Sequence, residues 1–470
     1  MSIENDLINI SKDKAFEKEG FKSLFGLTIE VEKEIILSIE KGKKKRLISL
    51  FQLLHPADQA DMLERLSKNN LNLCLNLLGK KLEPETLVFL DDEVKNEVIK
   101  KIGTSALIRA LPELKTDDAV EILEELNESD RSIVIKKLPK TERMLVEEAF
   151  SFPEHSAGRL MQRDFLSFPE YWTVGQTIDH MRTTFYEEEK NFYSVFITDP
   201  AQRLLGELSL AKLLSNNRST RLKDIMQFEF KSVNVNTDQE EVSLLFQQYG
   251  LVNIPVVDDE KKVLGIIIVD DIVDVITEEA EEDIFGLGGV RHGSIRASIF
   301  ETMKGRFSWL IINLITAIIA SSVISLFQNE IEKIVALAVL MPIVASMGGN
   351  AGTQTVTVAV RAIATRQLNY VNLQKFVLRE TWVGMLNGIL FAFLSSLLAF
   401  IWFNDIQIAL IMGVAMITNL LIAGILGTLI PLTLERYKID PAISSSVFLT
   451  TVTDVIGFFT FLGLAAWVIL

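Results

Sequence analysis

The sequence is poor in the residue types on which several classes of protein depend. One cysteine, Cys74, in 470 residues excludes an internal disulfide framework and a cysteine-based zinc site. The four histidines are scattered, and no catalytic triad, phosphate loop or histidine-bearing metal motif supports an enzyme. A net charge of −15 without a long basic run argues against nucleic-acid binding.

Charge is nearly absent from the last third of the chain. Residues 307–470 contain seven basic and seven acidic side chains, so the whole net charge of −15 lies in residues 1–306. The mean hydropathy of +0.28 then reflects an acidic soluble region followed by a membrane region. The amino-terminal residues MSIENDLINISKDK lack a basic stretch before an apolar core, so we expect no signal peptide and a cytosolic soluble region.

Five charge-free runs are each long enough to cross a hydrocarbon core of about 30 Å as a helix. They cover residues 307–329, 334–360, 381–404, 406–434 and 441–470, the last interrupted only by Asp454. With residues 1–306 in the cytosol, eight basic loop residues face the cytosol and only Lys333 faces outward, which fits the positive-inside rule. We therefore predict a multi-pass protein of the cell membrane with an external carboxyl terminus. Because five spans form no simple inverted repeat, a pore would arise more naturally between two copies, as in a homodimer.

Asp454 is a candidate for an ion pathway. It has 13 uncharged residues before it and 16 after it, and an ionised carboxylate at that depth costs about 3 kcal/mol or more. A structural partnership with a buried Lys or Arg is the alternative, but no span contains either. Thr451 supplies a nearby oxygen, and Gly457, one turn further on, allows another backbone to approach.

The second apolar run carries polar groups that are costly in lipid unless they line a wet cavity or pack against protein. They lie in the segment GGNAGTQT, which includes Asn350 and Gln354. Hard oxygen donors of this kind suit Mg²⁺, Ca²⁺ or Mn²⁺. A sparse site with one carboxylate per chain suits a cation that keeps its water, as Mg²⁺ does.

Two kinds of repeat organise the soluble region. Across residues 51–150, apolar residues recur every 12 positions, which predicts short stacked helices in an α-superhelical domain. Between about 156 and 276, a strand–strand–helix pattern occurs twice at an offset of 59 and resembles a tandem CBS pair, an α/β module that commonly binds adenosine nucleotides. The hydroxyl and Asp that usually hold the ribose are incomplete in both copies, with Ser209 but Lys212 in the first and Asp271 but Ile268 in the second. Nucleotide binding is therefore possible but weakly supported.

A strongly acidic stretch follows the second copy. Residues 258–283 hold eleven acids and two lysines, so they carry −9 of the total charge. If this stretch is helical, Asp270, Asp274, Glu278 and Glu282 form a column in which like charges repel by about 0.2–0.5 kcal/mol per pair. A solvated acidic face is the ordinary interpretation. Its position directly before the first span favours a sensor in which divalent cations neutralise the column and move the connecting helix.

The whole chain resembles the MgtE family of magnesium channels and transporters. The segments GNAGTQ (349–354) and TVTDVIG (451–457) carry the resemblance, together with the order of the domains. It implies residues 1–150 as the cytosolic superhelical N-domain, 151–276 as tandem CBS domains, 277–306 as a connecting (plug) helix and 307–470 as the five-helix transmembrane domain. It also implies a homodimeric Mg²⁺ channel with Asp454 at the central ion site, held closed by cytosolic Mg²⁺.

The resemblance further implies a set of regulatory ligands. Those in the second CBS domain and connecting helix are Asp271, Asp274, Glu279, Glu282 and Asp283. Asp238 and Glu240 are expected to face Asp117 and Glu121 of the N-domain.

Alternative functions remain open at this stage. Another divalent cation, such as Co²⁺ or Mn²⁺, is an alternative substrate because one carboxylate sets no selectivity. A membrane receptor that senses Mg²⁺ or nucleotide without conducting is the rival from another class. Asp454 and the amides of Asn350 and Gln354 favour transport, since a simple anchor does not require them.

Overall fold

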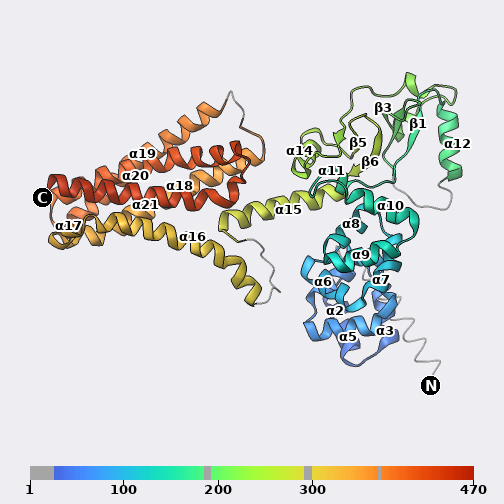
Figure 1. Cartoon of the computed structure of the whole chain (residues 1–470), viewed down its shortest axis with the longest axis horizontal. Helices are drawn as coiled ribbons and strands as arrows, with labels where there is room; N and C mark the ends of the chain where they lie inside the picture. The colour runs from blue at the N-terminus through green and yellow to red at the C-terminus, as the bar shows by residue number, and fades with distance from the viewer. Residues whose placement is uncertain (1–25, 185–191, 291–298, 369–371, 470) are drawn as a thin grey trace. The chain divides into compact units, whose positions relative to one another are not determined.

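The computed structural model describes residues 26–184, 192–290, 299–368 and 372–469 (Figure 1). The prediction for the amino-terminal segment therefore lies outside the described residues. The chain forms two compact units, Met1–Ile276 and Thr277–Leu470. The division falls within one helix, α15 (Val269–Gly288).

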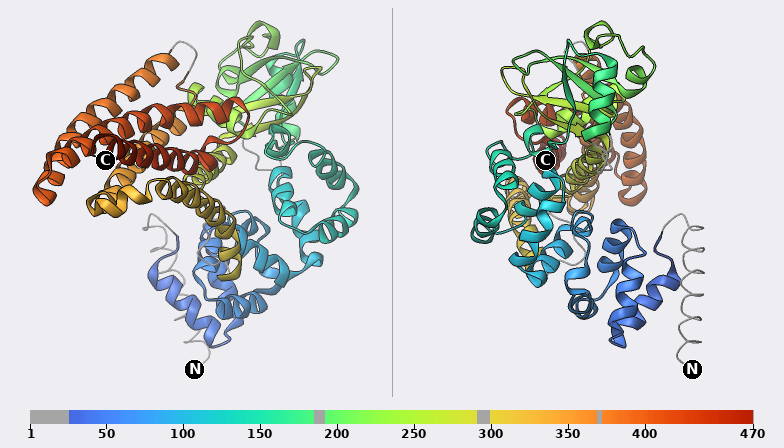
Figure 2. Two further views of the ribbon diagram at one scale, coloured as in Figure 1. Left: turned by 60° about the vertical axis from the view of Figure 1, so that its left-hand side comes forward. Right: turned by 90° about the vertical axis from the view of Figure 1, so that its right-hand side faces the viewer.

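The N-domain consists of short helices, as the 12-residue repeat predicts, and Figures 1 and 2 show them stacked in a coil. They are α2 (Ile29–Glu40), α3 (Lys44–Phe51), α4 (Pro56–Arg65), α5 (Lys68–Leu78), α6 (Asp92–Ile102), α7 (Thr104–Ala110), α8 (Thr116–Glu124), α9 (Glu128–Lys137) and α10 (Lys140–Ala149), with 3₁₀ turns η1 (Gly79–Lys81), η2 (Pro84–Leu87) and η3 (Leu111–Glu113). Side chains of Thr28, Ser67 and Asn127 cap helix starts by accepting backbone N–H bonds. One continuous apolar core runs through all of them, which confirms a helical superhelix.

The CBS region contains two sheets of identical topology. Their strands are β1 (Ser167–Pro169), β2 (Ser194–Thr198) and β3 (Leu204–Ser209), then β4 (Val233–Asn234), β5 (Asn253–Val257) and β6 (Val263–Ile268). In each sheet the first pairing is parallel and the second antiparallel. The helices are α11 (Ala157–Leu160), α12 (Val174–Thr184), α13 (Leu210–Leu214), η4 (Leu222–Asp224), α14 (Gln239–Tyr249) and α15. The repeated strand–strand–helix pattern is confirmed, and the Asn253 amide donates to Ser194 Oγ (2.7 Å), which joins the two copies.

The second unit is built from long apolar helices. They are α16 (Ile299–Ser325), α18 (Val335–Ala364), α19 (Leu373–Phe403), α20 (Ile406–Arg436) and α21 (Pro441–Val468), with the short α17 (Gln328–Lys333) between the first two. Among the described residues, five helices are long and apolar enough to cross a membrane, in agreement with the predicted number of spans. α19 begins before the third charge-free run, because a helix can place its polar first turns outside the apolar layer.

Glycines bring α19 and α20 close together. A Cβ at Gly384 of α19 would lie 2.7 Å from the Leu420 carbonyl oxygen of α20, and a Cβ at Gly424 would lie 2.8 Å from the Glu380 carbonyl oxygen. α20 is the most buried of the five helices, and it packs against α18, α19 and α21. Small residues thus let α20 occupy the centre of the bundle.

The connection between CBS domains and the first span is helical at both ends. α15 continues from the second CBS domain to Gly288, and Gly289 adopts a positive φ of 66° that ends it. α16 begins at Ile299 and is continuous into the first span. The described parts of the predicted connecting helix, 277–306, thus belong to the second half of α15 and the start of α16, while residues 291–298 lie outside the described residues. The domain boundaries stay predictions.

Candidate cation sites

The predicted pore residues lie on two helices that pack against each other, α18 and α21. Asp454 of α21 is half-buried, and Asn350 and Gln354 of α18 are exposed. Gly349 faces Thr450, since its Cβ would lie 3.8 Å from the threonine methyl group. Thr451 is half-buried and Gly457 is buried on α21. Within one chain, the two amides are therefore left uncovered beside the helix that carries Asp454.

Asn419 is a buried polar residue of the membrane unit that the sequence reasoning missed. It is fully buried in α20, and its Nδ2 donates to the Val344 carbonyl oxygen of α18 (2.8 Å), while Oδ1 has no hydrogen-bond partner. A Cβ at Gly457 would lie 2.8 Å from this Nδ2, and a Cβ at Gly348 would overlap the amide. The signal was present as a single amide in the middle of the fourth charge-free run. Asn419 thus holds α18 and α21 at the level just beyond Asp454.

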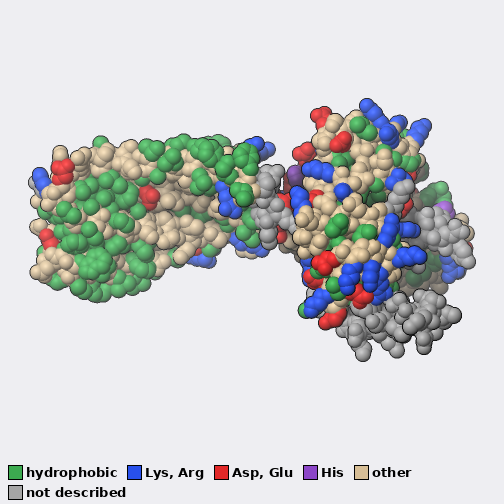
Figure 3. Space-filling model, turned by 90° about the horizontal axis from the view of Figure 1, so that it is seen from below, with side chains coloured by type: hydrophobic (Ala, Val, Ile, Leu, Met, Phe, Trp, Pro, Cys, Tyr) green, Lys and Arg blue, Asp and Glu red, His purple; other side chains and the backbone are tan. Residues whose placement is uncertain are grey.

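Figure 3 shows the difference in surface chemistry between the units. The membrane helices present mainly hydrophobic side chains on the face shown, with few charges. The soluble unit presents many Lys, Arg, Asp and Glu side chains on its face. The charge partition predicted from the sequence is therefore visible on the folded surface.

In the soluble unit, Asp117 of α8 faces Asp271 in the first turn of α15. Both carboxylate oxygens of Asp117 are buried without a hydrogen-bond partner. Burial, followed by the charge of Asp271, raises the pKa of Asp117 well above its ordinary value. Burial also raises the pKa of Asp271 to about 6, although a hydrogen bond from the Gln162 amide (3.2 Å) favours its charged form. Two facing carboxylates need a proton or a cation between them.

Three more charged groups surround this pair. Lys115, the residue before α8, places Nζ 3.5 Å from an Asp270 oxygen and 3.8 Å from an Asp271 oxygen. Burial, opposed by Lys115, raises the pKa of Asp118 to about 7. The N-domain thus meets α15 through four carboxyl groups and one ammonium group.

Glu121 and Asp274 lie one turn further along the same two helices. Glu121 forms an ion pair with Lys95 of α6, whose side chain is almost fully buried, and Asp92 lies 3.7 Å from the same ammonium. Burial and then the charge of Glu121 raise the pKa of Asp274. The N-domain acids that lie near acids of α15 therefore have a lysine beside them here as well.

Asp238 and Glu240 occupy a different setting. Asp238 is the N-cap of α14, where its side chain accepts a hydrogen bond from the Glu240 backbone N–H (2.9 Å). Residue 238 also forms a backbone bridge with Ser156, just before α11. The groups that most affect Asp117 are Asp271, Asp118 and Lys115. A role for Asp238 and Glu240 opposite Asp117 and Glu121 stays a prediction.

The remaining predicted ligands lie in the second unit. Burial, and then the charge of Asp440 at the start of α21, raise the pKa of Asp283, and Glu279 and Glu282 add to this repulsion while Arg361 of α18 opposes it. Leu287, one turn beyond Asp283, packs against an apolar cluster formed by Val356, Val360, Ala442 and Leu449. The end of α15 therefore contacts the same two helices that carry the pore residues.

Within the described residues, no three Asp, Glu, His or Cys side chains converge closely enough to hold a metal ion. The acids face one another in pairs, with the lysines described above beside them. The CBS positions typical of a ribose site are already engaged, since Ser209 caps α13 and Asp271 contacts Gln162. Nucleotide binding stays a prediction.

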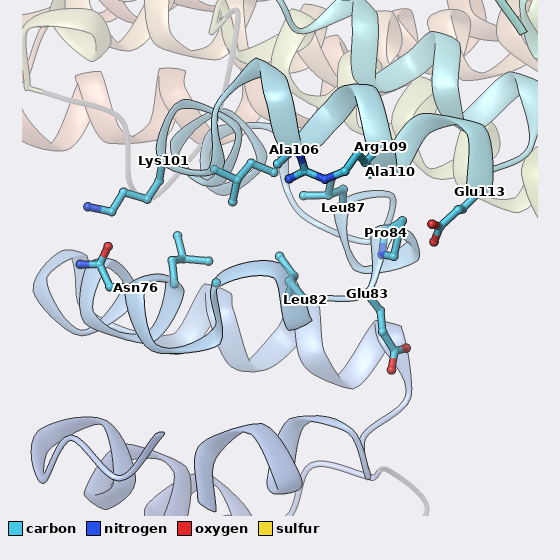
Figure 4. Close-up of a pocket in the computed structure, with 13 residues that line it drawn as sticks. Asn76, Leu82, Glu83, Pro84, Leu87, Lys101, Ala106, Arg109, Ala110 and Glu113 are labelled. Atoms are coloured by element: carbon cyan, nitrogen blue, oxygen red, sulfur yellow. The ribbon is translucent and has the colours of Figure 1, made fainter. Parts of the chain in front are cut away.

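A cavity of about 570 Å³ lies elsewhere, in the N-domain (Figure 4). Apolar side chains such as Leu82 and Leu87 form its walls, and Lys101, Arg109 and Glu113 stand around it. None of the predicted site residues lines it. It is therefore separate from the acidic contact between α8 and α15.

Comparisons with known proteins cover almost the whole chain. Residues 341–464 match the MgtE family, described as divalent cation transporters, residues 54–155 match the MgtE intracellular N domain and residues 222–278 match the CBS domain. The magnesium transporter MgtE of Thermus thermophilus is 31% identical over 91% of this chain and 96% of its own, and that of Bacillus subtilis is 29% identical over 92% and 96%. A solved structure, the cytosolic domain of the Mg²⁺ channel MgtE in complex with ATP, is 29% identical with a TM-score of 0.48, covering 52% of this chain and 99% of that one.

The superhelical N-domain, the CBS pair and five apolar helices with an intramembrane carboxylate define a multidomain membrane transporter of the divalent cation class. At this identity and coverage, the chain belongs to the MgtE family of magnesium transporters. The resemblance drawn from the two short segments is thereby confirmed.

Proposed function

We propose that the chain moves Mg²⁺ through the cell membrane along a pore between two copies, and that cytosolic Mg²⁺ closes this pore. The relatives are named as magnesium transporters, which supports Mg²⁺ as the substrate. The soluble unit then lies in the cytosol and the carboxyl terminus outside, in keeping with the distribution of basic loop residues.

The pore proposal depends on polar groups left uncovered within one chain. Asn350 and Gln354 are exposed on a membrane helix, where lipid offers no hydrogen-bond partner to an amide, and Asn350 Nδ2 donates to Ser346 Oγ of the same helix (3.3 Å). A second copy packed on this face would enclose them together with the half-buried Asp454. Two such carboxylates balance one divalent charge, and the amides and threonines offer oxygens to the ion's water shell. Asp454 binds the cation, and the neutral groups position its water.

One observation carries the gating proposal: Asp117 and Asp271 face each other with no donor for either oxygen of Asp117. Without a cation this pair must share a proton, and as it loses protons its repulsion weakens the contact between α8 and α15. Mg²⁺ prefers carboxylate oxygens and would remove that repulsion. The contact is therefore strong when Mg²⁺ is abundant and weak when it is scarce.

A path from this contact to the pore runs along α15. Its acidic column, Asp270, Asp274, Glu278 and Glu282, repels itself when no cation is bound. At its far end, Asp283 lies near Asp440, and Leu287 packs against residues of α18 and α21. Neutralising the acids lets this end of the helix settle on α18 and α21, which holds the pore closed.

Transport is tested by Mg²⁺ flux into proteoliposomes containing the full chain. Asp454→Ala and Asp454→Asn should both reduce uptake to near background, because the charge that offsets a desolvated cation is lost. Asp405→Asn is the matched control, since Asp405 only caps α20 through hydrogen bonds from Gln407 and Ile408. Uptake by Asp454→Ala equal to that of the wild type would disprove the pore assignment. Uptake of Co²⁺ or Mn²⁺ in preference to Mg²⁺ would favour another substrate, and no flux in any form would favour a receptor.

Gating is tested with the double variant Asp271→Asn/Asp274→Asn. Removing both charges should raise the cytosolic-side Mg²⁺ concentration that halves the flux, or abolish the inhibition. Glu128→Gln, an exposed change on α9, should leave the inhibition as in the wild type. Unaltered inhibition in the double variant would contradict the sensor role of this contact.

A further inference from the structure

The acidic contact between α8 and α15 already contains a positive charge of its own. Lys115 reaches from the N-domain to Asp270 and Asp271, at 3.5 and 3.8 Å, and its side chain is 41% exposed. Asp117 and Asp118 lie two and three residues after it, in the first turn of α8. Four carboxyl groups thus share one ammonium group, and the cluster keeps an excess of negative charge that attracts further cations.

Lys115 and a bound divalent cation would compete for the same oxygens. An ammonium group neutralises one charge and donates three hydrogen bonds from a flexible stem, whereas a divalent cation neutralises two. When such a cation binds Asp271, the ammonium loses its partners and is repelled. The lysine must then move away from these carboxylates, which its partial exposure permits.

A second lysine shows the same arrangement one turn away. Lys95 is buried with its ammonium group on Glu121, and its charge favours the ionised form of Asp274. At both positions where an N-domain carboxylate lies near α15, a lysine of the N-domain therefore lies beside it. This recurrence distinguishes the contact from an ordinary acidic surface.

On the basis of the proposed gating function, we propose that Lys115 is a resident counter-ion of the Mg²⁺ sensor: it holds the α8–α15 contact partly together without Mg²⁺ and competes with Mg²⁺ at Asp270 and Asp271. The lysine thereby raises the Mg²⁺ concentration at which the sensor responds. It also prevents the contact from separating fully when Mg²⁺ is scarce.

The expected effect follows from Coulomb's law. A single charge about 7 Å from a divalent ion, in water-like surroundings and screened by salt, changes its binding by about three- to tenfold. Lys115→Met removes the charge and keeps the length of the side chain. It should lower the Mg²⁺ concentration for half-maximal response by that factor and make the contact more open in chelator.

Two measurements use the full chain. In detergent, protection from a protease is measured as a function of Mg²⁺ concentration. In proteoliposomes, inhibition of Mg²⁺ flux is measured over the same concentrations. Lys115→Arg keeps the charge and should stay within about twofold of the wild type. Lys137→Met removes an exposed charge on α9 and should change nothing. Equal thermal stability of all forms at saturating Mg²⁺ shows that Lys115→Met folds normally.

The outcomes separate this inference from the proposed function. If wild-type protection and flux respond to Mg²⁺ while Lys115→Met responds at the same or a higher concentration, the counter-ion role is wrong and gating stands. If the wild type is protected by Mg²⁺ but its flux is not inhibited, gating is wrong, and the shift in protection still decides the role of Lys115. If Mg²⁺ neither protects nor inhibits the wild type, both are wrong.

Discussion

In the soluble unit, carboxylates meet lysines that can move or be replaced, whereas in the membrane unit a buried amide is held by backbone. Asp271 lies near the Lys115 ammonium, and the Asp117 carboxylate that faces Asp271 accepts no hydrogen bond. Asn419 donates to a helix carbonyl and fits between two glycines. Both regions bury polar groups, but only the first depends on the ions and protons available in the solution.

This difference assigns separate tasks to the two units. A contact made from excess negative charge changes its strength with pH and divalent cation concentration. A neutral hydrogen bond in a closely packed core does not. The soluble unit is therefore suited to respond to the cytosol, and the centre of the membrane unit is suited to keep α18, α20 and α21 in one arrangement.

The largest expected effect comes from placing a charge in the rigid region. Asn419→Asp keeps the shape of the side chain but adds a carboxylate and removes the donor to the Val344 carbonyl. A charge at that depth costs about 3 kcal/mol. We expect a fall in melting temperature of the detergent-solubilised protein by several degrees and a loss of Mg²⁺ flux.

Two further variants at this point sharpen the comparison. Asn419→Ala loses one hydrogen bond and some packing and should cost about 1–2 kcal/mol. Thr418→Val is the control, because Thr418 bonds only within its own helix, to the Val414 carbonyl. A melting temperature for Asn419→Asp equal to that of Thr418→Val would show that Asn419 does not hold these helices.

The same contrast between the two units explains which structural features could be predicted from the sequence. The 12-residue repeat was sufficient to predict the short N-domain helices, and the length of the charge-free runs was sufficient to predict the long apolar helices. The helical acidic column from Asp270 to Glu282 was also predictable, and α15 contains it. The strands β1 and β4 were missed, since three and two residues are too few to show alternation.

Pairing between distant elements was less accessible. Lys95 and Lys115 read as ordinary surface lysines of polar helices, and only the fold brings them to Glu121 and Asp271. Asn419 lies in an apolar run in which a single amide carries no indication of its partner, Val344, 75 residues away. Charge density drew attention to the acids of α15, and the family resemblance to those of α8, but neither indicated their counter-ions.

The second prediction concerns the buried lysine of the responsive region. Glu121→Gln leaves the buried Lys95 ammonium with one weaker partner, an Asp92 oxygen 3.7 Å away. Lys95→Met instead replaces a buried charge by an apolar side chain and leaves Glu121 in contact with water. Because Glu121 is about half exposed, solvent screening reduces the cost of Glu121→Gln to about 1–3 kcal/mol, and Lys95→Met should cost less. Urea unfolding of the soluble unit within the full chain measures both, and the reverse order would contradict the account.

The third prediction is a pH dependence of the α8–α15 contact without Mg²⁺. Burial raises the pKa of Asp271 to about 6 and that of Asp118 to about 7. Separated carboxyl groups titrate near pH ~4, so the contact holds protons that the separated state releases. Its stability is therefore greatest below about pH 4 and is lost as the pH rises through 6 to 7.

Protease cleavage in chelator should accordingly become faster between pH 5.5 and 7.5 by roughly severalfold. Saturating Mg²⁺ should flatten this dependence, because the cation replaces the protons. Asp271→Asn should reduce it. The protease must be equally active across this pH range. Under that condition, cleavage that slows as the pH rises would contradict the raised pKa values.

The smallest effect is expected where a charge pair is exposed and far from α8 and α15. Arg218 forms an ion pair with Asp179 of α12 at 2.6 Å, and both side chains are about 60% exposed. Exposed pairs contribute about 0–1 kcal/mol, so Arg218→Ala should shift the melting temperature by no more than about 2 °C and leave the Mg²⁺ response unchanged. An altered Mg²⁺ response in Arg218→Ala would show that net charge, rather than the contact between α8 and α15, controls the sensor.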